Sequence, residues 1–390
     1  MTSKKCVPKI HIMVVNITKT EYMIYGKPMK IDLFLNGNVI EKVDSYKSLG
    51  TVLSSIATTK GDIFKNNTDY LSQKARNAIF GIKKKLKFMG HLPPMHMFYL
   101  YESMIEPILL YGSDLWGSFK DCTKDINKIY LWFIRIVLNI KATTCNVITM
   151  GESGIIPPEV KCHINSILYF IRLNSLPNGS VVKSVFNELQ KLHLLGCQNW
   201  YSQILELSDK YGIKSTFLNF SESTKKTVKS IIKSHFINTW KSDVSNLDKY
   251  PSLRTYTMIK TQFICEPYLK HIKKQKYLIA FSRFRASSHI LEIERGRYTN
   301  PRTPRDQRLC ALCKEIEDEQ HFLINCKMYE KDRYTLFQKI TNIHSDFHNF
   351  SLEEKFIFMM NNEIPTILTW VAKFIHDSML KRVQIQLDRD

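Results

Sequence analysis

The chain has 390 residues, enough to bury a sizeable core and to divide into two or three units. Its apolar fraction of 44% is ordinary for a globular protein, but 56 basic against 36 acidic residues leave a formal net charge of +20. This excess indicates a polyanionic partner, of which nucleic acid is the commonest and an anionic membrane surface the alternative.

The sequence shows no signal peptide after Met1 and no uncharged apolar stretch of about 18 residues, so we expect neither secretion nor a membrane span. The nine cysteines are an odd number without a repeated framework. We therefore expect an intracellular protein of the nucleus or cytoplasm, where a cysteine cluster indicates a metal more often than a disulfide.

Residues 1–56 are predicted to form short strands. The candidate segments are residues 10–15, 22–25, 32–35, 39–43 and 46–53, and Asn36-Gly37 between two of them is a strong hairpin signal. These strands are too few for an independent sheet with both faces covered. We expect this region to be the end of a larger domain.

Residues 57–150 are predicted to be helical. A helix capped by Thr68 or Asp69 should run to about Met89, with its apolar residues on one arc at 100° per residue. The neighbouring arc is basic and carries Arg76, Lys83 and Lys87, with Lys84 beyond them. Such a face can simply be solvated, but the charge excess of the whole chain favours contact with backbone phosphates.

Apolar periodicity predicts further helices along the rest of the chain. They cover residues 96–116 with a kink at Pro107, 125–140, 159–175, 180–195, 198–210, 222–243, 253–264, 271–289, 327–340, 351–360 and 365–387, with a loop at 151–158. The expected fold class is therefore mainly α, with a helical region at 151–300 and C-terminal helices at 336–390. The five tryptophans are interpreted as core anchors and not as base-stacking platforms.

The predicted helix at 271–289 is also basic. Arg283 and Arg285 alternate with Phe281 and Phe284, a pattern typical of single-stranded nucleic-acid binding, where phosphates meet cations and bases stack. An amphipathic helix with its phenylalanines packed inward fits the same pattern equally well. Both interpretations stay open at this point.

Cys310, Cys313, His321 and Cys326 follow the spacing C-x2-C-x7-H-x4-C. Three thiolates and one imidazole satisfy a tetrahedral zinc ion, and a closed shell of four protein ligands makes the ion structural. We therefore predict a CCHC zinc-binding module at residues 301–335, the alternative being unrelated buried cysteines and a surface histidine. An arginine-rich segment that we expect to contact nucleic acid leads into it: Arg295, Arg297, Arg302, Arg305 and Arg308.

No catalytic residue is predicted. Cys162-His163 has no nucleophile signature around it, and adjacent residues on a helix point apart. The 14 glycines are dispersed and form no phosphate-binding loop.

Several of these segments together resemble one known family. Asn16-Ile17-Thr18-Lys19-Thr20 and Tyr46-Lys47-Ser48-Leu49-Gly50-Thr51-Val52-Leu53 resemble the end of the palm domain in reverse transcriptases of non-LTR (LINE-type) retrotransposons. Pro107-Ile108-Leu109-Leu110-Tyr111-Gly112-Ser113-Asp114-Leu115-Trp116-Gly117 is similar to their thumb domain, and the CCHC cluster to their C-terminal zinc-binding motif. The order of the segments is also that of the family.

The resemblance implies a role for each region. Residues 1–56 would be a partial palm, in which Lys19 matches the lysine of an Asn-x-x-Lys motif near the incoming nucleotide. The segment 46–53 would lie at the hairpin that holds the primer end. Residues 57–150 would be a thumb that grips the template–primer duplex, and the zinc module would bind RNA or DNA beside the polymerase.

The chain departs from the family at the catalytic centre. Polymerisation needs carboxylates that hold two metal ions. In the family these lie upstream of the Asn-x-x-Lys motif and include an aspartate pair, whereas this chain has no Asp-Asp pair and only fifteen residues before Asn16. We therefore expect a truncated chain that cannot polymerise alone, with zinc as structural cofactor and magnesium needed only by a full-length polymerase.

Two functions follow as hypotheses. The first is a nucleic-acid-binding C-terminal fragment of a retrotransposon RNA-directed DNA polymerase, whose partner is the element RNA or a template–primer duplex. The alternative is a stand-alone zinc-dependent RNA- or DNA-binding protein derived from such an element. A remnant without function is a third possibility, and the oligomeric state stays open.

Overall fold

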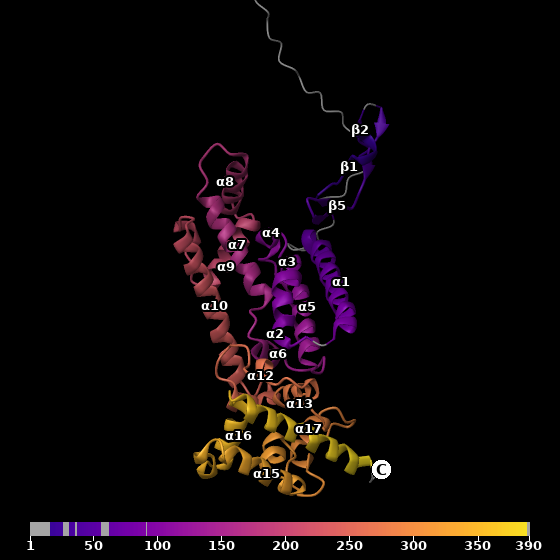
Figure 1. The fold of residues 1–390 in the computed structure, drawn as a ribbon. Coiled ribbons are helices and arrows are strands. Elements are labelled where there is room, and N and C mark those ends of the chain that lie inside the picture. Colours follow the sequence, from indigo (N-terminus) through magenta and orange to yellow (C-terminus); the bar gives the residue numbers. More distant parts are fainter. Residues whose placement is uncertain (1–15, 26–30, 36, 56–61, 91, 388–390) are drawn as a thin grey trace, which may run out of the picture. The chain divides into compact units, whose positions relative to one another are not determined.

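The computed structural model describes residues 16–25, 31–35, 37–55, 62–90 and 92–387 (Figure 1). It divides into two compact units, Met1–Tyr70 and Leu71–Asp390, with the boundary inside the first long helix. The described residues are mainly helical, with small two-stranded sheets near the N-terminus, which confirms the predicted fold class.

The described residues of the first unit form three two-stranded sheets. Phe34 pairs with Val39 in an antiparallel hairpin around Gly37, as predicted. The expected single strand at 46–53 is instead a hairpin, because Leu49 (φ 46°) and Gly50 (φ 89°) turn the chain in the left-handed region. The elements are η1 Ile17–Lys19, β1 Glu21–Tyr22, β2 Phe34–Leu35, β3 Asn38–Val39, β4 Glu41–Lys42, β5 Ser45–Ser48, β6 Thr51–Ser54 and η2 Asp62–Phe64. The strand predicted at 10–15, and Asn36 of the first hairpin, lie outside the described residues.

The second unit is helical, and its first helix, α1, begins in the first unit. In chain order the helices are α1 Lys65–Met89, α2 Pro94–Leu100, η3 Tyr101–Ile105, α3 Glu106–Leu109, α4 Ser113–Trp116, α5 Lys120–Leu138, α6 Asn146–Ser153, α7 Pro158–Asn174, α8 Val181–Leu194, α9 Trp200–Lys210, η4 Ser215–Phe217, α10 Glu222–Ser245, η5 Pro251–Leu253, α11 Tyr256–Ile259, α12 Tyr268–His271, α13 Gln275–Arg285, α14 Glu292–Arg295, η6 Arg305–Gln307, η7 His321–Asn325, η8 Lys327–Tyr329, α15 Glu330–Thr341, η9 Ser345–Asn349, α16 Leu352–Asn361 and α17 Pro365–Leu387.

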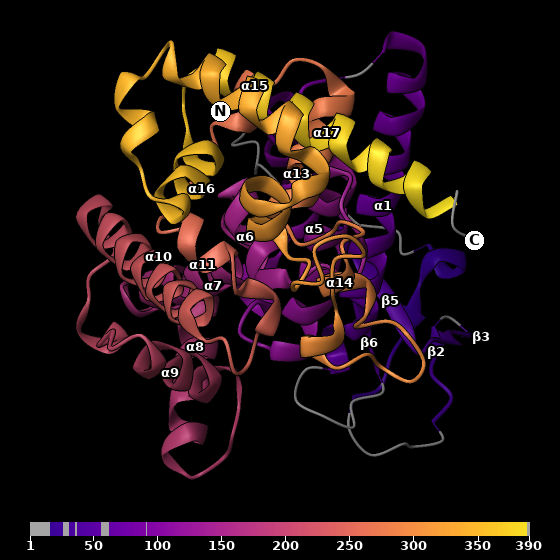
Figure 2. The same cartoon turned by 90° about the horizontal axis from the view of Figure 1, so that it is seen from below.

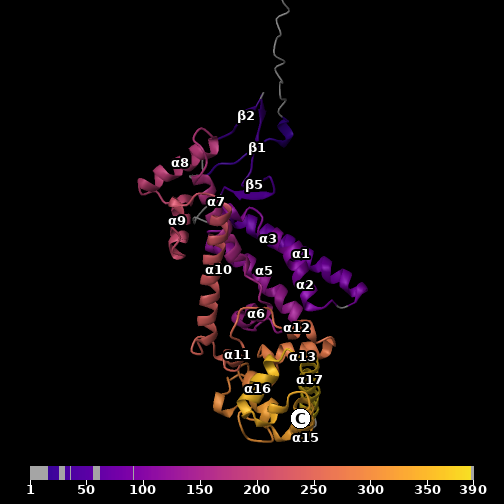
Figure 3. The ribbon, with the colours of Figure 1, turned by 60° about the vertical axis from the view of Figure 1, so that its left-hand side comes forward.

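Helix α7 is the centre of one packed layer of this unit. It contacts α4, α5, α8, α9 and α10, and Figures 1 and 3 show α7 and α10 running side by side. Its apolar residues recur at helical spacing, and Ile164, Ile167 and Ile171 are buried against Phe186 and Ile232 of its neighbours. Proline at its first position starts the helix without losing a backbone hydrogen bond.

The C-terminal helices form a second packed group. Helix α17 packs against α13, α15 and α16, which lie together in the view of Figure 2. Buried rings join this group to the predicted zinc module. The ring centroid of Phe322 in η7 lies 5.5 Å from that of Phe284 in α13 and 4.8 Å from that of Tyr329. Phe281 and Phe284 are both fully buried, so the inward-packing interpretation of this helix is the correct one.

Three predicted boundaries are corrected. The helix expected at 253–264 is reduced to a single 3₁₀ turn and the short α11. The predicted loop at 151–158 begins inside α6, which ends at Gly154 in the left-handed conformation (φ 64°). The helix expected at 96–116 runs without a break through α2, η3 and α3, with the π-helical turn η3 just before the turn that holds Pro107, and a turn at residues 110–112 separates it from α4.

Trp116 and Trp240 are buried, as expected of core anchors, while Trp132, Trp200 and Trp370 are half-buried.

Within the part of the chain that the structure describes, every helix is too short or too polar to span a bilayer.

Candidate metal centre

A tight turn brings Cys310 and Cys313 to one side of the chain. Leu309 and Ile316 form an antiparallel bridge, and the Cys310 N–H donates to the Glu315 carbonyl at 2.7 Å. The Lys314 N–H donates back to the Cys310 carbonyl at 3.0 Å, with Lys314 in the left-handed region (φ 60°). The turn thus aims two sulfur atoms at a common point, as the two-residue gap predicted.

The other two ligands lie at the two ends of a single π-helical turn, η7. His321 is its first residue and Cys326 directly follows its last residue, and the Cys326 N–H donates to the His321 carbonyl at 2.8 Å. Buried Arg333 of α15 donates to the Leu323 carbonyl at 3.0 Å and hydrogen-bonds the Cys326 carbonyl. The arginine therefore fixes the end of the turn that carries the fourth ligand.

The four side chains meet in space. Their ligand atoms all lie within 4.8 Å of one another. Cys326 Sγ lies 3.8 Å from Cys310 Sγ and 3.9 Å from Cys313 Sγ. A tetrahedral zinc ion with Zn–S bonds of about 2.3 Å separates its sulfurs by about 3.8 Å, whereas a disulfide requires about 2.05 Å. The sulfur spacing is therefore that of a metal site.

His321 supplies an independent test of the fit. Its Nδ1 lies 3.1 Å from a carboxylate oxygen of Glu315. Its Nε2 is buried without a hydrogen-bond partner among the described residues, which is costly for a polar atom unless a ligand occupies its lone pair. With Nδ1 donating its proton to Glu315, Nε2 is the free ligand atom, the arrangement that metal-bound histidines commonly have.

The thiols themselves favour a bound cation. Burial raises the pKa of Cys326, and the neighbouring Cys310 and Cys313 raise it further. Three thiolates this close are stable only around a positive ion, because their mutual repulsion is otherwise uncompensated. The residues fit a structural zinc ion with four protein ligands, and such a closed shell leaves no open position for catalysis.

Buried ion pairs attach this module to distant helices. Glu319, between the two halves of the cluster, accepts from Arg254 Nη2 at 2.8 Å and lies 2.8 Å from His289 Nε2. Burial alone would raise the pKa of Glu319, but the charge of Arg254 and the contact with His289 hold it well below its usual range. Glu317 pairs with Arg382 of α17 at 2.6 Å. The module is therefore part of the helical unit.

Sequence reasoning did not identify these carboxylates. Acidic residues in such a charged segment are usually exposed, but Glu317 and Glu319 are both almost fully buried. Their partners lie 65 residues away in each direction, and no local pattern predicts them.

The predicted nucleic-acid contacts fall into two groups. The first group is exposed: Lys19 in the first unit, Arg76, Lys83, Lys84 and Lys87 on α1, and Arg295, Arg302 and Arg305 in the segment before the metal ligands. Arg295 is also within 3.2 Å of Glu292. Arg283 is exposed but donates to the Asn139 carbonyl at 2.8 Å, and half-buried Arg297 pairs with Glu294 at 3.0 Å.

Two of the predicted contacts are wrong. Arg285 is fully buried and lies 3.1 Å from Glu152. Arg308 is buried and donates to the carbonyls of Ile293 and Thr303 at 2.8 Å. Neither guanidinium can reach a phosphate backbone, because each satisfies groups inside the protein.

No protein-family model matches this chain, and no curated protein is significantly similar to it.

Proposed function

We propose that this chain is a zinc-dependent nucleic-acid-binding protein that corresponds to the C-terminal part of a non-LTR retrotransposon reverse transcriptase. The observation that supports it best is the Cys310, Cys313, His321 and Cys326 centre, with metal-like geometry, which exposed Arg302 and Arg305 precede in the sequence. Zinc fixes the backbone of such a module, and arginines on a fixed backbone bind phosphates with less loss of entropy.

The charge distribution supports the same function. The net charge of +20 favours a polyanionic partner, and exposed lysines are concentrated on α1, where Lys83, Lys84, Lys85 and Lys87 follow one another. Their distance along the helix is short, so several phosphates of one strand or duplex could be contacted together. This basic helix lies within residues 57–150, the region that the resemblance assigns to the thumb.

The ordered resemblance decides which nucleic-acid-binding protein we propose. The hairpin β5–β6 covers the segment that resembles the primer-holding hairpin, and Lys19 keeps the position of the family's Asn-x-x-Lys lysine. The chain has no Asp-Asp pair to hold catalytic magnesium ions. We therefore propose that it binds element RNA or a template–primer duplex and does not extend a primer by itself. Primer extension by the purified chain with magnesium would refute the second part.

Salt dependence of binding tests the proposal. Fluorescence anisotropy with a labelled DNA duplex should give an affinity that falls steeply with salt, by a slope of log affinity against log salt of about −0.9 per neutralised phosphate. The variant Arg302→Gln/Arg305→Gln should make this slope shallower by the amount that about two phosphate contacts contribute. The control Lys226→Gln/Lys229→Gln removes two exposed charges of α10, far along the chain from the zinc module. It should change the salt slope less than the arginine variant does. A flat salt response of the wild-type chain would refute nucleic-acid binding.

A further inference from the structure

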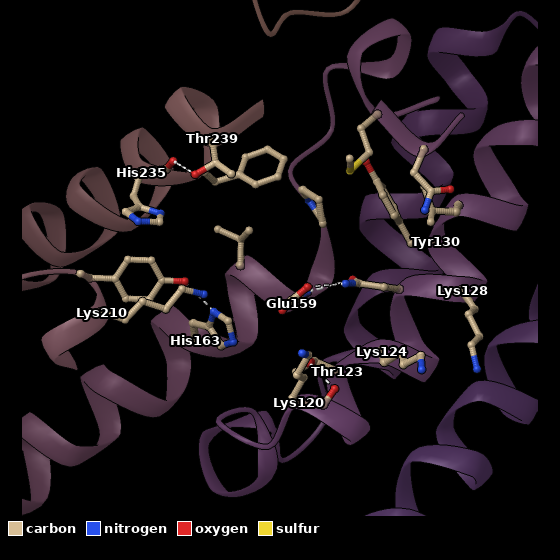
Figure 4. A pocket seen from close by; sticks show the side chains of 18 residues that line it. Lys120, Thr123, Lys124, Lys128, Tyr130, Glu159, His163, Lys210, His235 and Thr239 are labelled. Atoms are coloured by element: carbon tan, nitrogen blue, oxygen red, sulfur yellow. Dashed lines mark hydrogen bonds between the residues drawn. The ribbon is translucent and has the colours of Figure 1, made fainter. Parts of the chain in front are cut away.

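A cavity of about 610 Å³ lies within the helical unit, away from the metal centre. Its walls come from α5, α6, α7 and α10 and from the end of α9 (Figure 4). Its volume is in the range of pockets that hold small ligands or single groups of larger ones. None of the residues predicted to contact metal or nucleic acid lines it.

One side of this cavity is a row of lysines. Lys120, Lys124 and Lys128 succeed one another at four-residue spacing, so they share one face of α5, and Figure 4 shows Lys210 on the opposite side. Lys128 pairs with Asp125 at 2.7 Å. Among the described residues, no carboxylate lies within ion-pair distance of Lys120, Lys124 or Lys210.

The acidic lining does not neutralise this row. Among the described residues that line the cavity, Glu159 is the one carboxylate, and its side chain accepts a hydrogen bond from Asn127 Nδ2 at 2.7 Å. Asn127 in turn accepts from the Glu159 N–H at 3.1 Å, so both groups are occupied at the start of α7. The cavity thus keeps a surplus of positive charge that an anionic ligand would balance.

The other side of the cavity is aromatic. Tyr211 and His235 form an edge-to-face pair with ring centroids 5.0 Å apart, and Phe236 lines the cavity beside them. The Tyr211 hydroxyl lies 2.7 Å from His163 Nδ1, a contact that fixes the tyrosine ring. His163 carries no charge at neutral pH, since burial and the nearby Lys210 lower its pKa to about 3. A flat apolar group fits this wall, because aromatic rings stack on such surfaces.

We propose that this cavity takes one base of a single-stranded nucleic acid against Tyr211, His235 and Phe236, with successive phosphates along Lys120, Lys124 and Lys128. The row rises by about 6 Å per four residues, or about 12 Å in all, which exceeds the reach of one phosphate group. A strand therefore fits it better than a free nucleotide. The inference rests on the proposed nucleic-acid binding and assigns it a second, base-stacking site on the helical unit.

Paired variants test the lysine row. With a fluorescent oligothymidylate, Lys120→Gln/Lys124→Gln should reduce the slope of log affinity against log salt by about 1.4, or 0.7 for each lost contact with a single strand. The control Lys226→Gln/Lys229→Gln removes the same charge from exposed lysines of α10 that do not line the cavity. Equal effects of the two double variants would overturn the inference while leaving nucleic-acid binding intact, whereas no binding by the wild type would refute the proposed function itself.

A second pair of experiments tests the aromatic wall. Tyr211→Leu should weaken oligothymidylate binding on the order of tenfold, and Tyr211→Phe, which keeps the ring, should bind nearly as the wild type does. Ultraviolet crosslinking of the wild-type chain to an iodouracil-substituted oligonucleotide should map to Tyr211, His235 or Phe236 without any variant. Crosslinks confined to other segments, or competition by thymidine monophosphate as strong per mole as by the oligonucleotide, would overturn the inference.

Discussion

Arg285 and Glu152, which are 133 residues apart in the chain, form an ion pair with no exposed surface on either side chain. Arg285 Nε lies 3.1 Å from one Glu152 oxygen, and Arg285 Nη2 lies 2.8 Å from Glu266, which also pairs with buried Lys260. Burial alone would lower the pKa of Arg285, but Glu152 and Glu266 raise it above its usual value. Four buried charges thus balance and join α6 to α13.

Removing the centre of this cluster should be strongly destabilising. Arg285→Met leaves Glu152 and Glu266 buried with one cation, and we expect a loss of about 3–5 kcal/mol in the free energy of unfolding, measured by urea denaturation. The control is Lys191→Met, which removes an exposed partner of Glu188 and should cost less than about 1 kcal/mol. Similar losses in the two variants would show that the buried cluster carries no special stability.

Zinc should hold the module folded. A structural site of this type contributes on the order of 10 kcal/mol through metal binding, so chelation or Cys313→Ser should unfold residues of about 305–330. Hydrogen exchange by mass spectrometry should show lost protection there, while Cys197→Ser, an exposed cysteine outside the cluster, should keep the wild-type pattern. Metal analysis that finds no zinc in the purified wild type would contradict this prediction.

Gly154 should resist substitution more strongly than Gly196. Both have positive φ, so alanine strains each backbone by about 1 kcal/mol. A Cβ at Gly154 would also lie 2.2 Å from the Cys265 nitrogen, whereas Gly196 has open space around it. We expect thermal unfolding to show a clearly larger loss for Gly154→Ala than for Gly196→Ala. Equal melting temperatures would mean that the loop at Cys265 moves freely.

His163 should make the helical unit less stable in acid. Its folded pKa is about 3, against about 6.5 in an unfolded chain, so below pH 6.5 the unfolded state binds more protons. The stabilising contribution is complete above pH 6.5 and is lost as the pH falls toward 3, by about 2 kcal/mol at pH 5. His163→Asn should flatten this part of the profile of unfolding free energy, and the exposed control His96→Asn should not. A wild-type profile in His163→Asn would contradict the assignment.

Local patterns predicted most of the helices but not what joins them. The periodicity at 159–175 and 365–387 anticipates α7 and α17 closely, because each helix buries one apolar face. Helix α6 was not among the predicted helices, and the loop expected at 151–158 begins inside it. Gly151 of this helix must be a glycine for packing reasons, because a Cβ there would lie 2.5 Å from the Tyr256 hydroxyl and 2.6 Å from the Trp240 ring.

The four metal ligands were predictable, whereas their surroundings were not. A metal imposes a spacing on the sequence, so Cys310, Cys313, His321 and Cys326 could be named together before any fold was known. Arg285 and Arg308 have the same sequence signature as an arginine that contacts phosphate, and only their burial separates them from it. The cavity near Lys120 is formed by five separate elements, and no single segment shows it.

The attachment of Glu317 and Glu319 to Arg382 and Arg254 bears on how this protein can be dissected. A peptide cut to residues 301–335 would carry the complete ligand set yet expose two carboxylates that have lost their arginines. The smallest piece worth expressing on its own therefore runs from before Arg254 to beyond Arg382. A nonsense codon that removes the last turns of α17 would take away Arg382 and leave buried Glu317, close in sequence to the candidate metal ligands, without its partner.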